Sequence, residues 1–245
     1  MPAIDALNSY FEHIEIVGLF SILLITGILF SFMPSAFLNS GSSFMRISEL
    51  GIAVTGTEFV MTILYSFFTI LLSSVFISLF IMTIKSKESF YSPPTSELAG
   101  LLIRFTGHMT LFFIMLFGVA FIIQAAVLYS GAAMHYGSLF IFLIYLPFTF
   151  VPVSIVVDEN NVLNACMDSI RFISKHAFNL FYYWAIAVVL VFVITLISFA
   201  LDPILFMGKY MSLILNTMFV LPYLVALQTH LYLHKYTLMK PKFKS

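Results

Sequence analysis

The feature that most constrains this sequence is a series of long apolar runs separated by short polar segments. A helix needs about 20 apolar residues to cross the hydrocarbon core of a bilayer. Helices are favoured there because backbone polar groups in lipid must bond within their own segment. The composition agrees, since 61% of the residues are hydrophobic and 9% are charged, against about 45–50% and about 25% in soluble domains. We therefore predict an all-α, polytopic integral membrane protein with six transmembrane helices.

We predict that residues 1–245 form a single transmembrane domain. The predicted spans cover about residues 14–33, 58–85, 101–131, 138–157, 179–200 and 210–234. Three further segments, 1–13, 96–108 and 158–178, carry apolar and polar residues on opposite faces of a helix. Amphipathic helices of this kind lie in the plane of the membrane interface. We predict that these three segments lie there, on the cytoplasmic side.

The segment 158–178 has the clearest amphipathic pattern of the three. Its apolar residues recur at steps of three and four, which places them on one helical face: Leu163, Cys166, Met167, Ile170, Ile173 and Ala177. The opposite face carries Asn164, Asp168, Arg171 and Lys175. Asp158 or Asn160 is the predicted N-cap, because both side chains can accept a bond from a free amide of the first turn.

Lysine and arginine are distributed unevenly over the two sides of the predicted topology. With both termini on one side, only Arg46 and Lys209 of the eleven basic residues lie on the other side. Cytoplasmic loops carry the excess of lysine and arginine, so both termini are predicted to be cytoplasmic in a cell membrane. The net charge is zero, and no basic patch with interleaved aromatic residues is present, so nucleic acid is not an expected partner. Membrane lipids are expected partners, and a membrane or cytoplasmic protein is a further one.

Three short segments before the odd-numbered spans share an order of residues. They read LNSYFEH at 7–13, LIRFTGH at 102–108 and SIRFISKH at 169–176. Each places an aromatic residue and then a histidine just before a span. A threefold pseudo-repeat of an amphipathic helix and two spans explains this order, and chance similarity of short segments is the alternative.

The segment Val151–Trp184 carries a further order of features. A proline-containing span is followed by an acidic pair, a helix with small residues near its middle, basic residues and an aromatic-rich span. These positions are Pro152, Asp158, Glu159, Ala165, Ser169, Arg171, Lys175 and Phe178–Trp184. In this order the segment resembles a group of six-span membrane proteins that includes the membrane domain found beside some glycerophosphodiester phosphodiesterases. The resemblance implies a six-span architecture. The phosphodiesterase activity is not carried over, because this sequence shows no soluble phosphodiesterase domain.

Histidine is the residue type that most suggests chemistry in this sequence. Five histidines fall at the inner ends of the predicted spans: His13, His108, His176, His230 and His234. His230 and His234 are four residues apart on one helical face, which is a spacing that a metal site can use. No carboxylate or cysteine completes an obvious set of ligands. We therefore interpret these histidines as residues of the membrane–water interface, with one side of the ring in an apolar environment and the other hydrogen-bonded. We predict no metal and no cofactor.

Three basic residues are candidate contacts for a lipid or a partner protein: Arg104, Arg171 and Lys175. Arg104 lies near the start of the third span. An arginine there either extends its charged group to the interface or binds a lipid phosphate through two hydrogen bonds. Both interpretations remain open from the sequence.

No acidic or basic residue lies at the centre of a predicted span, where proton relays and ion-coupled sites place them. The sequence also contains no HExxH, GxSxG or P-loop motif, so we predict no catalytic site. Three classes of function remain, of which the first is a non-catalytic membrane component that binds lipid or a protein through its cytoplasmic helices. The second is a transporter for an uncharged or amphiphilic solute, with kinks at Pro147, Pro152 and Pro222. The third is an intramembrane enzyme that uses the inner histidines.

Overall fold

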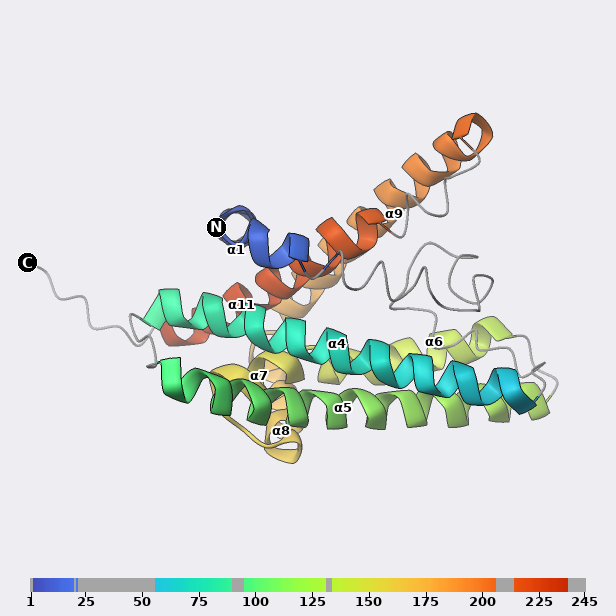
Figure 1. The fold of residues 1–245 in the computed structure, drawn as a ribbon, viewed down its shortest axis with the longest axis horizontal. Helices are drawn as coiled ribbons and strands as arrows, with labels where there is room; N and C mark the ends of the chain where they lie inside the picture. Colours follow the sequence, from blue (N-terminus) through green and yellow to red (C-terminus); the bar gives the residue numbers. More distant parts are fainter. Residues whose placement is uncertain are drawn as a thin grey trace, which may run out of the picture.

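The computed structural model describes residues 2–19, 21, 56–89, 95–130, 134–205 and 214–237. Within these ranges the regular elements are all helical (Figure 1). They are α1 (Pro2–Glu12), α4 (Gly56–Ser89), α5 (Thr95–Tyr129), α6 (Met134–Tyr145), the 3₁₀ turn η2 (Leu146–Phe148), α7 (Val151–Val157), α8 (Val162–Lys175), α9 (Ala177–Leu205), the π-helical turn η3 (Asn216–Val220) and α11 (Leu221–Thr237).

Four helical stretches are long and apolar enough to cross a membrane: Phe67–Glu88, Glu97–Val127, Leu139–Val157 and Ala177–Ala200. They coincide for the most part with the predicted second to fifth spans. The structure therefore confirms a multi-span, all-α protein. Most of the predicted first span lies outside the described residues. Six spans and the threefold pseudo-repeat stay predictions.

Helices α4 and α5 lie side by side and run in opposite directions, forming the longest layer of the molecule (Figure 1). Helix α11 packs against α4, and α1 packs on α11. Helix α9 contacts α8 and α11 and then extends away from the α4–α5 pair (Figure 1). Large apolar side chains along α9 are exposed, among them Phe192 and Phe199. Lipid covers such a surface in a membrane protein without hydrophobic cost.

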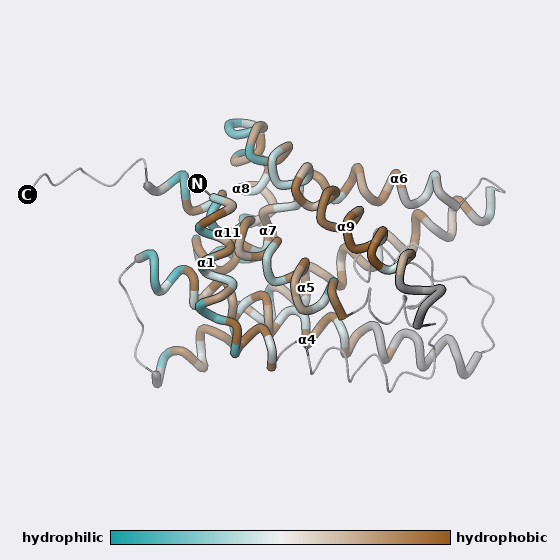
Figure 2. The backbone as a smooth tube through the Cα atoms, turned by 90° about the horizontal axis from the view of Figure 1, so that it is seen from above, coloured by the Kyte–Doolittle hydropathy of each residue, from teal (hydrophilic) through white to brown (hydrophobic). Residues whose placement is uncertain are grey.

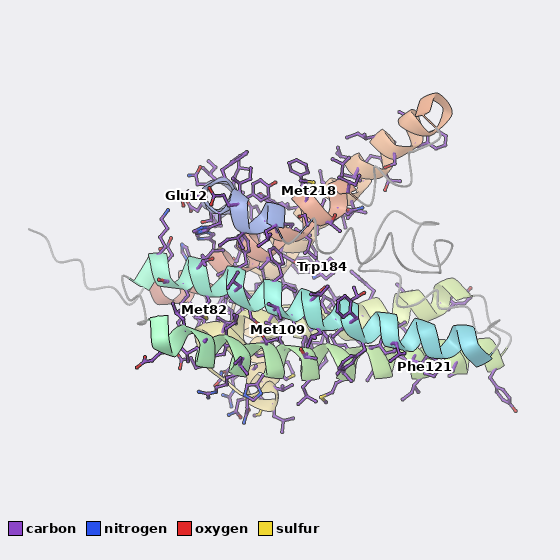
Figure 3. All side chains as sticks on the ribbon, viewed as in Figure 1. Glu12, Met82, Met109, Phe121, Trp184 and Met218 are labelled. Atoms are coloured by element: carbon purple, nitrogen blue, oxygen red, sulfur yellow. The ribbon has the colours of Figure 1, made fainter. Side chains whose placement is uncertain are left out.

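The core of the described structure surrounds the short helix α7. All residues from Val151 to Val156 are buried. Phe80 of α4 and Met109 of α5 are completely buried in the same core. Met82 and Met109 lie along the facing sides of the α4–α5 pair (Figure 3). Helix α7 contacts α4, α5, α8 and α11, so it is the element around which the others are arranged.

The predicted fourth span is not one kinked helix but two helices joined by a break. Pro147 lies in η2, and Pro152 lies in the first turn of α7, where its missing N–H costs nothing. In one continuous helix these prolines would free the carbonyls four residues earlier, at Leu143 and Phe148. The structure instead shows side-chain hydrogen bonds at the Pro147 and Thr149 carbonyls. The reason is that the chain leaves the α-helical path over residues 146–150, which moves the free backbone groups into the break.

Side chains from two helices bond to the backbone of this break, and a third helix bonds to a side chain within it. The Ser169 hydroxyl of α8 donates to the Pro147 carbonyl at 2.8 Å and accepts from the Phe150 N–H at 3.2 Å. The Gln228 amide of α11 donates to the Thr149 carbonyl. The Trp184 indole N–H of α9 donates to the Thr149 hydroxyl at 3.3 Å. The break is therefore closed by α8, α9 and α11, because buried backbone groups without partners are costly.

Helix α8 packs on the protein through a different face from the apolar face predicted for the segment 158–178. Its buried face consists of Val162, Ala165, Ser169 and Phe172. The predicted apolar face includes Leu163, which is 70% exposed, and the exposed residues Met167 and Ile170. The face with Ser169 is the buried one because the Ser169 hydroxyl bonds to the break and the Phe172 ring packs on the Phe150 ring, with centroids 4.8 Å apart.

The N-cap of α8 is Asn161, whose side-chain oxygen accepts from the Asn164 amide at 3.0 Å. The prediction of Asp158 or Asn160 as the cap was wrong. Both of those side chains instead bond to residues farther away in the sequence, Asp158 to Tyr232 and Asn160 to Asp168. These tertiary bonds hold the chain so that the next residue, Asn161, reaches the free amides of the first turn.

We expect Ser169→Ala to destabilise the protein by about 1–3 kcal/mol, because it leaves a buried carbonyl and a buried N–H without partners. Ser174→Ala is the matched control, since the Ser174 hydroxyl bonds only locally to the Arg171 carbonyl on the exposed side of α8. Its expected effect is within about 0.5 kcal/mol. Unfolding of both variants in detergent micelles measures the difference. Equal stability of the two variants would contradict the assigned role of Ser169.

Candidate functional site

Charged and polar side chains gather at one end of the helix bundle, around the segment Asp158–Asn161 that joins α7 to α8. We call this region the charged end. In Figure 2 hydrophilic residues cluster there, on the last turns of α4 and α11 and on α8, whereas most of α9 is coloured as hydrophobic. This is the distribution expected where helices leave the hydrocarbon core for water.

Asp158 is the most buried carboxylate of the charged end among the ion pairs that the structure shows. Its side chain is 11% exposed and lies 3.0 Å from the ammonium group of Lys235. The Tyr232 hydroxyl donates to the same carboxylate oxygen at 2.5 Å. The Lys235 ammonium also donates to the Tyr232 hydroxyl at 2.9 Å and lies 4.0 Å from the centre of the Tyr232 ring. The carboxylate, the phenol and the ammonium therefore fix the end of α11 to the end of α7.

Glu159 has a backbone φ of 56°. For a residue with a Cβ atom this left-handed conformation costs about 1–2 kcal/mol. Neighbouring helices hold the residue in place. The Lys85 ammonium of α4 donates to the Glu159 carboxylate and to the Val156 carbonyl, both at 3.0 Å. The Arg104 guanidinium of α5 donates to the Glu159 carbonyl at 3.4 Å. These contacts offset the strain and join α4 and α5 to the same turn.

A second set of polar contacts continues along α8. The Asn160 amide donates to the Asp168 carboxylate at 2.7 Å, and Arg171 pairs with the other oxygen of that carboxylate at 3.5 Å. These residues line an open polar hollow of about 320 Å³ together with Asn164 and Met167. The Arg171 side chain is largely exposed, so its guanidinium can bind a further group.

The structure brings two of the predicted contact residues to the same connecting segment. Arg104 reaches it through the Glu159 carbonyl, and Arg171 reaches it through Asp168 and Asn160. Lys175 is the last residue of α8 and is exposed. The adjacent acidic residues directly after an apolar run were the signal in the sequence for this turn. Their partners Lys85, Tyr232 and Lys235 were not predicted, because they come from distant helices.

The five predicted histidines are not gathered into one cluster. His230 bonds to the Ser9 hydroxyl at 2.8 Å, which joins α11 to α1. The His13 ring lies edge-on to Phe80 at 6.2 Å, and its Nε2 atom is buried without a hydrogen-bond partner in the described part of the chain. The His176 ring stacks near Phe172 at 5.1 Å. Over the same residues, no group of three or more His, Cys, Asp and Glu side chains could hold a metal ion.

Four carboxylates at the charged end each pair with a cation. Asp158 pairs with Lys235, Glu159 with Lys85, and Asp168 with Arg171. Glu12 at the end of α1 (Figure 3) pairs with Lys87 of α4, and this hydrogen bond lowers the pKa of the Glu12 carboxyl. Such an arrangement joins the helices at this end of the bundle.

No family model, curated protein or solved structure matches this chain.

We expect Asp158 and Lys235 to be coupled in a double-mutant cycle with Asp158→Asn and Lys235→Met. The coupling energy should be about 1–3 kcal/mol, because the pair is mostly shielded from water and shares a bond with Tyr232. The pair Glu12 and Lys87 is the control, with both side chains about half exposed. Its coupling should be close to zero, since exposed ion pairs contribute little. Urea unfolding in micelles gives both values, and a smaller coupling for Asp158 and Lys235 than for the control contradicts the role assigned to Asp158.

The stability of the protein should fall as the pH decreases, in part because of His13. Burial lowers the pKa of the His13 ring below its unfolded value, an effect that Glu12 opposes and Lys87 strengthens. Between the ordinary histidine pKa of about 6.5 and the lower folded value, the unfolded chain binds more protons, so acid favours unfolding. His13→Phe keeps a ring against Phe80 and removes this effect.

The measurement for His13 is thermal unfolding at pH 7.5 and pH 5, roughly one unit or more on either side of the ordinary pKa. The difference between the two pH values should be smaller in His13→Phe than in the parent. The exposed His234, changed to Phe, controls for the loss of any histidine. An unchanged pH dependence in His13→Phe excludes this contribution.

Proposed function

We propose that the protein is a non-catalytic component of the cell membrane that binds lipid through the helices of its charged end. The observation that carries this proposal is the surface of α8. Leu163, Met167 and Ile170 are exposed along one side of the helix, and Arg171 and Lys175 are exposed beside them. An apolar strip next to cations is the surface of a helix that lies in a membrane interface. The apolar residues enter the acyl region, and the cations meet lipid phosphates.

The orientation of the chain supports the proposal. We place both termini and the charged end in the cytoplasm, because the basic residues of the charged end belong to the side that holds most lysine and arginine. The cytoplasmic leaflet carries the anionic lipids. Arg104, Arg171 and Lys175 are then at the height of the phosphates. A six-span topology, as the resemblance of Val151–Trp184 implies, belongs to this proposal.

The two alternative functions receive less support from the contacts. A transporter was suggested by the prolines of the fourth span, but Ser169, Trp184 and Gln228 occupy the break between Pro147 and Pro152. An enzyme was suggested by the inner histidines, but His13, His176 and His230 contact different neighbours. A protein partner remains a second occupant for the exposed face of α8, since apolar and basic residues also suit an acidic protein surface.

We expect the double variant Arg171→Gln and Lys175→Gln to bind anionic lipid more weakly, by about 1 kcal/mol per charge. The measurement is the rise in unfolding temperature of the detergent-solubilised protein as phosphatidylglycerol is added, with phosphatidylcholine as the neutral reference. Lys87→Gln is the matched control, because Lys87 is exposed at the charged end and already paired with Glu12. Equal stabilisation of the parent by the two lipids excludes the proposed binding of anionic lipid and favours a protein partner.

A further inference from the structure

An open apolar groove of about 500 Å³ runs between α4 and α5. Leu71 and Val75 line it from α4, and Ile103, Gly107 and Ile114 line it from α5. Ile103 and Gly107 are exposed, whereas Phe105 and Met109 of α5 point into the protein core. The groove is therefore on the outer surface of the helix pair, where lipid surrounds the protein.

Two hydroxyl groups in this groove have no hydrogen-bond partner. Thr106 and Thr110 both line the groove, and their Oγ1 atoms are buried and unbonded in the described part of the structure. Thr110 is 9% exposed. Other threonines behave differently, since Thr195 of α9 and Thr229 of α11 donate to the carbonyl four residues earlier. A buried hydroxyl that does not use this local acceptor is costly unless another group supplies one.

A cationic side chain lies next to the groove, on the side nearer the charged end of the bundle. Arg104 follows the groove residue Ile103 in the sequence and is exposed. Its guanidinium has one long hydrogen bond, to the Glu159 carbonyl at 3.4 Å. Among the described residues, no carboxylate lies within ion-pair distance of Arg104, whereas Lys85, Arg171 and Lys235 each have one. The guanidinium therefore keeps donors for a phosphate, which it can bind through two bonds.

The spacing of these groups along α5 fits one lipid molecule. At about 1.5 Å per residue, Thr106 lies about 3 Å and Thr110 about 9 Å deeper than Arg104. The groove continues to Ile114, about 16 Å along the helix from Ile103. One leaflet of the hydrocarbon core is about 15 Å thick, half of about 30 Å. A phosphate at Arg104 thus places ester carbonyls near the two hydroxyls and an acyl chain along the apolar groove.

We propose that this groove binds one anionic diacyl phospholipid, with its phosphate on Arg104. Its ester carbonyls accept hydrogen bonds from Thr106 and Thr110 once rotation about χ1 turns each buried hydroxyl to the groove. A second transmembrane helix is a poorer occupant, because an apolar span brings no phosphate to the Arg104 guanidinium. The ester carbonyls of a phospholipid are free acceptors. This site is separate from the face of α8, and the inference rests on the proposed function only in that both concern membrane lipid.

The test uses the purified full-length chain, freed of lipid in detergent and titrated with phosphatidylglycerol in native mass spectrometry. Diacyl phosphatidylglycerol is compared with its diether analogue, which has the same phosphate and chains but no ester carbonyls. The double variant Thr106→Val and Thr110→Val keeps the shape of both side chains and removes both hydroxyls. It should bind the diacyl lipid about tenfold more weakly, at about threefold per hydrogen bond in a membrane protein. Binding of the diether lipid should be unchanged by these substitutions.

A second variant fills the groove. A Cβ atom added at Gly107 would meet no atom of a packed neighbour within 4 Å, and Gly107 lines the groove, so Gly107→Phe places its ring there. It should lower the affinity for the diacyl lipid at least about tenfold. Gly118→Phe is the matched control, because Gly118 is equally open on the same helix and does not line the groove. Its affinity should equal that of the parent.

Several outcomes overturn the inference. Parent-like affinity of the valine variant for the diacyl lipid excludes the two hydroxyls as donors. Parent-like affinity of Gly107→Phe excludes the groove, and a loss of dimers in Gly107→Phe with lipid binding intact assigns the groove to a second copy of the chain. If the parent binds phosphatidylglycerol and only Arg171→Gln with Lys175→Gln weakens it, this inference fails and the proposed function stands. If every variant binds phosphatidylglycerol like the parent, and the parent binds all the lipids equally, both this inference and the proposed function fail.

Discussion

The structure depends on how the backbone of one interrupted span is satisfied inside the membrane. An unbonded backbone group in hydrocarbon costs several kcal/mol, so a break in a spanning helix persists only where other groups complete its hydrogen bonds. Here Ser169 of α8 and Gln228 of α11 complete them, and Trp184 of α9 bonds to the Thr149 side chain in the same break. The break between α6 and α7 is therefore the point at which three other helices must meet. It fixes the rotation of α8 and the approach of α11.

The charged end follows from the same constraint. Because α7 is short and starts at the break, it ends at Asp158, where the chain turns back into α8. The Asp158 carboxylate accepts a hydrogen bond from Tyr232 and pairs with Lys235, both of α11. The Glu159 carboxylate pairs with Lys85 of α4. The left-handed conformation of Glu159 is held by these contacts, which also tie the ends of the long helices together. The ion pairs at the charged end therefore hold α4 and α11 to one end of α7, while the hydrogen bonds at the break hold α8 and α11 to its other end.

Three of the exposed apolar surfaces are the main candidates for contact with lipid. One is the side of α8 that carries Leu163 and Ile170, one is the length of α9, and one is the groove between α4 and α5. The first and the third adjoin cations, Arg171 and Arg104 respectively, whereas the described part of α9 is almost free of charge. We infer that α9 contacts bulk lipid, and that the other two surfaces select lipids with an anionic head group.

The sequence by itself determined the class of the protein, because runs of apolar residues leave only the helix as a way to satisfy the backbone in lipid. Four spans follow from run length alone, and the adjacent acidic residues Asp158 and Glu159 marked a turn at the end of the fourth. The tertiary structure decided which face of α8 is buried, which residue caps it and which distant side chains hold the turn. Periodicity places the apolar residues Ile170 and Phe172 on different sides of the helix, but it cannot show which of them packs on protein and which faces lipid, since both environments are apolar. The hydrogen bond from the Ser169 hydroxyl to the Pro147 carbonyl, 22 residues earlier in the sequence, determines which side is buried.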